Sequence, residues 1–265
     1  MTAGMFRGLW HYRHFVLSSI RTDLRSRFAR SKLGGLWMII NPLAQVLIYA
    51  LILSNVIAAK LPGVESQYAY AIYLMAGLLA WTLFMEVVSR SLTLFIDQGN
   101  LIKKMNFPRI TLPAIVAGSS LLNNLLLFAA MLGIFLLLGH QFTWAMLWLV
   151  PLTLLLLAFA LGLGLVLGVI NVFVRDIGQG VPIVLQMWFW LTPIVYPITI
   201  IPEGQRGWFD FNPIYPIVHA YQEVILYGRA PEGAGLVVMA GVALALLLFG
   251  FFVFRRANEE MVDAL

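Results

Sequence analysis

Residues 21–42 read RTDLRSRFARSKLGGLWMIINP, and here a crowded basic segment turns into an apolar run that continues to residue 58 without a formal charge. A helix needs about 20 largely apolar residues to cross the roughly 30 Å of hydrocarbon in a membrane, and residues 36–58 supply them. Asn41 and Pro42 interrupt the run near its start. A proline leaves one backbone carbonyl unpaired, which lipid cannot satisfy. We therefore expect a kinked first span, covered at the kink by neighbouring protein.

The composition of the 265-residue chain also indicates a membrane protein. The chain is 61% hydrophobic and 11% charged, with a mean hydropathy of +0.89, which is far from the balance of a soluble domain. A net charge of +5 would suggest nucleic acid in a soluble protein, but in a membrane protein the placement of the charges matters more than their sum. We expect no nucleic-acid partner. The absence of cysteine excludes disulfides and thiolate metal sites.

Apolar segments along the chain predict an all-α membrane protein with six spans. The expected spans cover residues 36–58, 68–89, 110–138, 144–174, 181–201 and 236–254. The fifth changes character partway, because Pro193 and Pro197 follow its aromatic residues. The apolar run over residues 213–226 is too short to cross a membrane. We therefore expect re-entrant or interfacial helices between spans five and six.

The basic residues predict the orientation of these spans. With six spans both termini lie on one side, and fourteen of the seventeen Lys and Arg residues fall on that side. Lys60, Arg206 and Arg229 fall on the other side. Because lysine and arginine concentrate on the cytoplasmic face, we expect both termini in the cytoplasm. Residues 97–109 are then cytoplasmic, and residues 202–231 face outward.

Residues 1–33 are expected to form a cytoplasmic amphipathic segment lying at the level of the lipid headgroups. At about 100° per residue, one stripe of this segment is apolar and basic residues flank it. The stripe consists of Phe6, Trp10, Leu17, Ile20, Leu24 and Phe28. Two interpretations of the basic flanks remain open. They either anchor the topology or hold an anionic lipid substrate.

Several polar or small residues inside the spans predict contacts between helices. Glu86 and Arg90 stand four residues apart and can pair on one helix face. Asn123 and Asn124 lie within an apolar span, where amides usually bond to a neighbouring helix. The pair Gly164 and Gly168 has the small-xxx-small spacing that lets helix backbones approach closely.

The segment DQGNLIKKMNFPR, residues 97–109, is the most informative interruption between spans. Its centre can form a short amphipathic helix, and Pro108 disfavours helix at Phe107. The apolar side chains are too numerous for a solvated loop, and Lys103 and Lys104 lie beside them. The residues alone leave two interpretations open, a membrane edge and a groove on a partner protein.

Absent motifs narrow the function. The sequence contains no GxxxxGK[ST] phosphate loop, so the chain is not a P-loop ATPase by itself, and it contains no HExxH or GxSxG motif. The sequence has no internal repeat and no acidic residue at mid-membrane, so it lacks the features of an ion-coupled transporter. The remaining classes are a pore and a pump subunit that a partner powers. We expect no enzyme activity from this chain alone.

Four segments resemble the ABC-2 type permeases that export bacterial surface polysaccharides, and the resemblance is strongest to O-antigen and teichoic-acid export permeases. Residues of the motif at the first span are Asp23, Arg27, Phe28, Ser31, Leu33, Gly34, Trp37 and Pro42. LIKKMNFPRITLP, residues 101–113, is similar to that family's segment between spans two and three. RDIGQGVPIVLQMWFWLTPIVYP and NPIYPIVHAYQEVILYGRAP resemble its fifth span and its outer re-entrant region. The resemblance covers nearly the whole chain in order.

The resemblance implies an ABC-2 transmembrane domain over residues 34–265, in the cytoplasmic (inner) membrane of a bacterium. It implies a homodimer with two copies of a separate ABC ATPase, which would bind ATP and Mg²⁺, so this chain itself would hold no cofactor. The cargo would be a polysaccharide carried on a polyprenyl pyrophosphate lipid. The alternatives are an ABC-2 permease for a drug or another lipid, and an unpowered oligomeric channel.

The resemblance places a coupling helix, and the chemistry of a lipid-linked glycan selects the other candidate residues. A helix that couples the chain to the ATPase would contain Gln98, Asn100, Leu101, Ile102, Lys103, Lys104, Met105 and Phe107. Basic side chains that match the lipid pyrophosphate would be Arg25, Arg27, Arg30 and Lys32. Aromatic rings offer sugars a flat apolar face, and the candidates for a channel wall or outer gate are Trp188, Trp190, Tyr196, Tyr215 and Tyr221. An interfacial aromatic belt is the alternative for these five.

Overall fold

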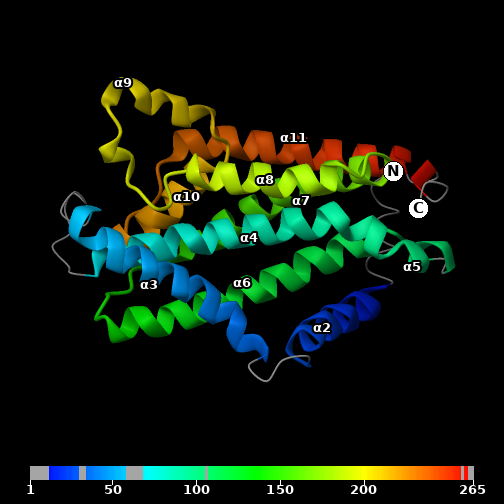
Figure 1. Ribbon diagram of the computed structural model, residues 1–265, viewed down its shortest axis with the longest axis horizontal. Coiled ribbons are helices and arrows are strands. Elements are labelled where there is room, and N and C mark those ends of the chain that lie inside the picture. Colours follow the sequence, from blue (N-terminus) through cyan, green and yellow to red (C-terminus); the bar gives the residue numbers. More distant parts are fainter. Residues whose placement is uncertain (1–11, 30–33, 58–67, 105–106, 258–259, 262–265) are drawn as a thin grey trace.

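The computed structural model describes residues 12–29, 34–57, 68–104, 107–257 and 260–261. Throughout these ranges the chain forms helices and turns, without a strand. The long helices lie side by side along one axis (Figure 1). The all-helical fold expected from the sequence is therefore confirmed for the described residues.

The helices follow one another with short connections. In chain order they are α2 (Arg13–Ala29), α3 (Trp37–Ile57), α4 (Ala69–Asp97), α5 (Gly99–Lys104), α6 (Thr111–Leu137), α7 (Leu149–Phe173), α8 (Ile177–Trp190), α9 (Glu203–Arg206), α10 (Tyr215–Gln222) and α11 (Gly233–Ala257). Short 3₁₀ turns are η1 (Gly34–Leu36), η3 (Trp144–Trp148), η4 (Ile198–Ile200) and η5 (Gly207–Phe211). A π-helical turn, η6 (Glu223–Tyr227), extends α10.

Four segments in the described part are long and apolar enough to cross a membrane. They are Ala69–Asp97, Thr111–Leu137, Trp144–Phe173 and Gly233–Ala257. These coincide with four of the predicted spans, although α4 continues to Asp97, eight residues beyond the predicted end. The helix α3 occupies the first predicted span, with Pro42 inside it. The chain is therefore a multi-pass membrane protein.

The predicted fifth span differs from the structure. Its helix, α8, has 14 residues, begins at Ile177 and ends at Trp190, so at 1.5 Å per residue it is about 21 Å long. The hydroxyl of Thr192 donates to the carbonyl of Trp188 at 2.9 Å. Pro193, which has no backbone N–H, follows directly. Residues 191–201 therefore continue as turns and not as the second half of one long helix.

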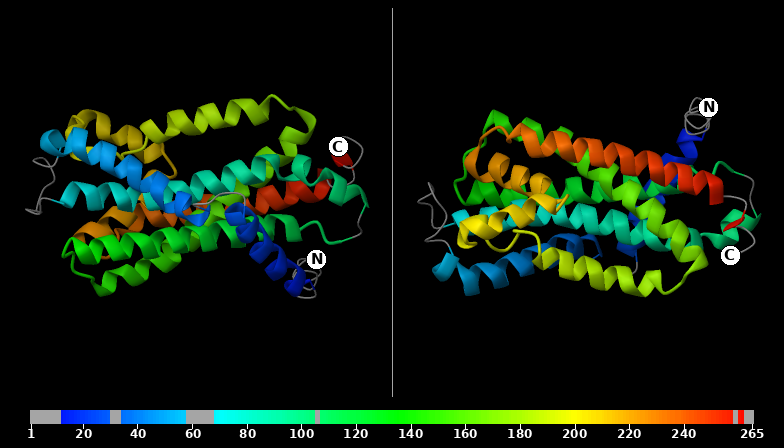
Figure 2. Two further views of the ribbon diagram at one scale, coloured as in Figure 1. Left: turned by 60° about the horizontal axis from the view of Figure 1, so that its bottom comes forward. Right: turned by 90° about the horizontal axis from the view of Figure 1, so that it is seen from above.

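The interior of the bundle is built around α4, most of whose side chains are buried. Both views in Figure 2 show α4 between its neighbouring helices. Phe84 of α4 stacks on Phe159 of α7, with ring centroids 5.7 Å apart. Its ring also meets Trp188 of α8 edge-on at 5.4 Å. These aromatic contacts join α4, α7 and α8 in one core.

Glycines allow α7 to lie directly against α4. A methyl group at Gly164 would lie 2.5 Å from Cβ of Ser91, and one at Gly168 would overlap the Ser91 carbonyl oxygen. On the other side of α7, Gly162 makes a similar close contact with α11, where Gly250 faces it. The close approach predicted from the spacing of Gly164 and Gly168 is therefore confirmed.

The N-terminal helix α2 packs against α6. Ile20 is 8% exposed, and its Cδ1 atom lies where a methyl group on Gly118 would be. Leu17, on the same predicted stripe, is 62% exposed. Phe6, Trp10 and the side chain of Phe28 lie outside the described residues. Part of the apolar stripe thus packs against α6. The position of α2 at the level of the lipid headgroups stays a prediction.

We expect Gly168→Ala to lower the free energy of unfolding by about 1–3 kcal/mol, because the added methyl forces the α4 and α7 backbones apart. The measurement is the unfolding transition of the purified protein in mild detergent. Gly241→Ala in α11 is the matched control, since beyond its own stretch of helix no described atom lies within 4 Å of its new methyl group. Equal transitions for both variants would show that the contact is not close.

Candidate functional site

The candidate residues gather at the two opposite ends of the bundle. Figure 1 shows α5 and the last turns of α11 at one end and α9 and α10 at the other. We call these the α5 end and the α10 end. The predicted coupling residues lie at the α5 end, and the predicted aromatic residues lie toward the α10 end.

The helix α5 divides its side chains between the chain's own core and its surface. Ile102 is 6% exposed and belongs to a cluster that includes Phe95 of α4 and Phe254 of α11, whose rings stack at 5.3 Å. Leu101 and Phe107 are half-buried, and Asn100, Lys103 and Lys104 are exposed.

The ring of Phe107 also lies 6.1 Å from that of Phe15 in α2. Gln98 is the half-buried C-cap of α4, and Met105 lies outside the described residues. The surface that α5 offers to a partner is therefore mainly polar and basic, while its most buried apolar residue packs inside the chain.

Of the residues predicted to bind the pyrophosphate, the structure describes the side chain of Arg25. Arg25 is exposed on α2. Arg27 lies in the same helix, but its side chain, together with Arg30 and Lys32, lies outside the described residues. Their joint role stays a prediction.

A polar cluster around Arg90 joins α2, α4 and α6. The guanidinium donates from Nη2 to Oδ2 of Asp23 at 2.9 Å and from Nη1 to the hydroxyl of Ser119 at 2.6 Å. Glu86 lies one turn earlier on α4, 3.6 Å from Nη1, so the predicted Glu86–Arg90 pair is confirmed. The side chains of Asp23 and Arg90 are 27% and 22% exposed. These contacts fix the N-terminal helix to the bundle.

The amides predicted to bond between helices do so. Asn123 of α6 donates to Oε2 of Glu86 at 2.5 Å, and Asn124 donates to the carbonyl of Leu79 at 2.9 Å. The contact of Arg90 with Asp23 was not predicted, because 67 residues separate the two. One available signal was an acidic residue in a mostly basic amphipathic segment.

The five candidate aromatic residues have different surroundings. Trp188 donates from Nε1 to Oδ1 of Asn212 at 2.9 Å, and Tyr196 donates to the carbonyl of Trp190 at 2.8 Å. Trp190 is 52% exposed and Tyr215 is half-buried. Tyr221 is 1% exposed and shares a hydrogen bond of 2.6 Å with Thr153 of α7. Within the single chain, therefore, Tyr221 does not reach the surface.

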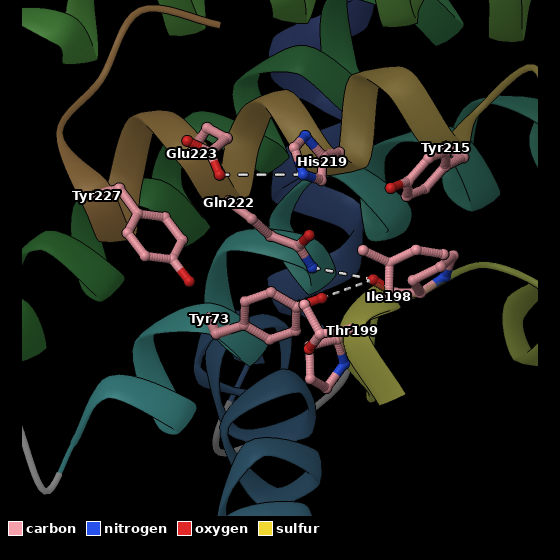
Figure 3. A pocket seen from close by; sticks show the side chains of 10 residues that line it. Tyr73, Ile198, Thr199, Tyr215, His219, Gln222, Glu223 and Tyr227 are labelled. Carbon is pink, nitrogen blue, oxygen red and sulfur yellow. Dashed lines mark hydrogen bonds and ion pairs between the residues drawn. The ribbon is translucent and has the colours of Figure 1, made fainter. Parts of the chain in front are cut away.

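A pocket of about 110 Å³ opens at the α10 end, between α4, α10 with its π-turn, and residues 193–199. Figure 3 shows the side chains that line it. They are Tyr73, Pro193, Pro197, Ile198, Thr199, Tyr215, His219, Gln222, Glu223 and Tyr227. We call this the outer pocket. It brings one predicted residue, Tyr215, together with side chains that the sequence analysis did not select.

Hydrogen bonds fix the floor of the outer pocket. The hydroxyl of Tyr73 and Nε2 of Gln222 both donate to the carbonyl oxygen of Pro193, each at 3.1 Å. His219 and Glu223 stand one turn apart on the same helical face, with Nε2 and Oε1 separated by 3.9 Å. Burial raises the pKa of Tyr215 to about 12, so its hydroxyl keeps its proton well into the alkaline range.

Part of this pocket could have been read from the sequence. Tyr215, His219, Glu223 and Tyr227 recur every fourth residue, and this spacing places polar and aromatic groups on one face of a helix. Tyr73 and residues 193–199 come from distant parts of the chain. Their meeting depends on tertiary packing, which the periodicity does not encode.

The sequence also has relatives among known proteins. Residues 15–226 match the family described as ABC-2 type transporter. An O-antigen export system permease protein, RfbA, of Myxococcus xanthus is 30% identical over 263 residues, 98% of this chain and 99% of that protein. An RfbA protein of Klebsiella pneumoniae is 27% identical over 92% of each chain. The polysialic acid transport protein KpsM of Escherichia coli is 26% identical over 91% of this chain and 93% of that protein.

The helical bundle, with its four segments of spanning length, defines a multi-pass membrane protein. The family match extends over most of the chain and includes nearly all of α2, the spanning helices through α7, α8 and all but one of the residues that line the outer pocket. The chain belongs to the ABC-2 type transporter family.

We expect Asp23 and Arg90 to be energetically coupled by about 1 kcal/mol in a double-mutant cycle with alanine, because their charged groups meet at 2.9 Å and are partly shielded from water. The measurement is the free energy of unfolding of both single variants and the double variant in detergent. The pair of Glu203 and Arg206, separated by 3.9 Å at the surface, is the control and should show no measurable coupling. Additive effects of Asp23→Ala and Arg90→Ala would contradict the prediction.

Proposed function

We propose that this chain is the permease subunit of an ABC exporter that moves a polysaccharide linked to a polyprenyl pyrophosphate across the cytoplasmic membrane. The observation that carries the proposal is the colinear match, over nearly the full length of both chains, to permeases named for O-antigen export. A separate ATPase subunit binds ATP and Mg²⁺ in this proposal, since the sequence has no phosphate-loop motif.

The proposed topology has six spans and cytoplasmic termini. The four long segments, α3, and α8 with the turns over residues 191–201 supply the six crossings. Basic residues support this orientation, because those at the α5 end outnumber those at the α10 end. In the described residues the first group includes Lys103, Lys104, Arg109, Arg175, Arg255 and Arg256. On the outer side, α9, α10 and the π-turn form the re-entrant region.

We propose further that two copies of the chain form the transport path. One face of α8 supports this, because Ile183, Val184 and Met187 are each about 60% exposed and apolar. Lipid or a second copy can cover such a face, and a homodimer places two α8 helices beside one path. Trp190, Tyr196 and Tyr215, with Trp188 behind them, would give that path aromatic rings along which sugars can slide. We leave Tyr221 out of this wall because it is buried.

The proposed ATPase contact is the exposed basic surface of α5, one on each chain of the dimer. Only Gln98 separates α5 from α4, so a push on α5 acts directly on the central helix of the bundle. The pyrophosphate of the lipid would meet Arg25, Arg27, Arg30 and Lys32 at the start of the first span. Guanidinium groups suit it because their paired donors match phosphate oxygens.

Removing the gene should abolish surface polysaccharide and leave lipid-linked glycan on the cytoplasmic side, because the chain supplies the only path for it. The measurement is surface polysaccharide by gel and antibody, with the lipid-linked pool extracted separately. Restoring the wild-type gene is the control. Normal surface polysaccharide in the deletion strain would refute the proposed cargo.

The double substitution Lys103→Glu and Lys104→Glu should reduce recovery of the ATPase with the purified chain by about tenfold. The proposed contact pairs the two lysines with acidic groups of the ATPase, and the new carboxylates would repel those groups. Recovery from mild detergent, measured by mass spectrometry, tests this. The control is Arg229→Glu, the same kind of charge reversal on an exposed residue at the α10 end. Unchanged ATPase recovery in the α5 variant would place the docking site elsewhere.

A further inference from the structure

The outer pocket has ring faces around polar groups, which is the arrangement of a small-ligand site. Tyr73, Tyr215 and Tyr227 come from α4, α10 and the π-turn and surround the same space (Figure 3). Its volume of 110 Å³ is about seven times the space that one buried water needs on the same measure. The space therefore suits a single small polar ring better than a chain of rings.

Gln222 contributes a buried acceptor to this pocket that has no partner among the described residues. Its side chain is 2% exposed, and Nε2 is held by the carbonyl of Pro193. That bond fixes the amide, and its Oε1 atom remains without a hydrogen bond. Buried polar atoms in folded proteins are nearly always paired, so an unpaired one in a pocket wall indicates a missing donor.

A second acceptor lies one residue further on. Glu223 is 24% exposed at its side chain, and its carboxylate reaches the pocket beside His219. An ionised carboxylate only accepts hydrogen bonds. It therefore repels a phosphate or another anion and favours a ligand that donates from hydroxyl groups.

Close packing holds this arrangement in place. A methyl group on Gly77 of α4 would lie 3.0 Å from Nε2 of Gln222 and 3.1 Å from a methyl group of Ile194. The absence of a side chain at Gly77 thus lets α10 and the turn at Pro193 lie directly on α4. Packing of α10 against α4 therefore fixes the positions of both acceptors.

We propose that the outer pocket is a binding subsite for one sugar ring of the exported polysaccharide. The tyrosine rings contact the C–H faces of the sugar, and its hydroxyl groups donate to the carboxylate of Glu223 and, after a small shift of the amide, to Oε1 of Gln222. This inference rests on the proposed function, because it takes its ligand from the cargo. It differs from an aromatic wall along which sugars slide, since the two acceptors hold one ring at a defined position.

The test uses single-cysteine chains, which the cysteine-free sequence allows without other changes. Thr199→Cys places a thiol at the exposed rim of the pocket, and Ala230→Cys places one on the exposed loop beyond the π-turn as the matched control. The complex with its ATPase, in lipid nanodiscs, is labelled with a maleimide. Labelling is timed with and without polysaccharide that mild acid has released from the same cell's surface lipid.

We expect the released polysaccharide to slow labelling of Thr199→Cys and to leave Ala230→Cys unchanged. Adding Glu223→Gln to Thr199→Cys should raise the polysaccharide concentration needed for half-protection about tenfold, because one charge-assisted hydrogen bond is lost. Tyr215→Phe, which keeps the ring, should raise the polysaccharide concentration needed for half-protection less than Tyr215→Ala does.

Each other outcome overturns the subsite. Unprotected Thr199→Cys in a complex that restores export in cells would refute the subsite and leave the proposed function intact. Equal protection by dextran, an unrelated glucose polymer, would show that the pocket does not recognise the cargo. Normal surface polysaccharide in the deletion strain would refute the proposed function and the subsite with it.

Discussion

The contact of α7 with α4 at Ser91 holds the two halves of the chain together. Lipid offers no hydrophobic gain when one apolar helix meets another, so association depends on close packing and on polar contacts. Gly164 and Gly168 supply the packing, because either methyl group would collide with Ser91. Around this contact the aromatic core of Phe84, Phe159 and Trp188 and the cluster of Arg90 take their positions. A change in the α4–α7 distance would therefore disturb both ends of the bundle.

The sequence predicted the elements that depend on patterns among residues close together in the chain. Apolar runs of about 20 residues or more indicated the four long segments, and the Gly164–Gly168 spacing indicated a close helix contact. The end of α8 at Trp190 was missed, although Thr192 and Pro193 carry the physical reason for it. The apolar pattern continues through this turn, because residues 192–195 and Pro197 are also buried. Hydropathy alone therefore does not separate a helix from turns that other helices cover.

In the candidate sites, too, only the features that depend on neighbouring residues in the sequence were predicted. The short helix over residues 99–104 followed from its pattern, but the burial of Ile102 depends on Phe254 at the far end of the chain. Tyr215 was selected as an aromatic residue on the outer side. Its neighbours Tyr73 and Gln222 were not selected, because they meet only when α10 lies on Gly77. Contacts between distant segments thus account for most of what the sequence did not predict.

The helix α4 takes part in both ends of the molecule. Tyr73 lies in the outer pocket near its first turn, and its last turn leads through Gln98 into α5. Its 29 residues make a rod of about 43 Å, and a rod transmits force without storing it in loops. A tilt of about 5° at one end would move the other end by about 4 Å. The pocket and the α5 surface are therefore two ends of one lever, so a displacement at one end of the bundle has a mechanical counterpart at the other.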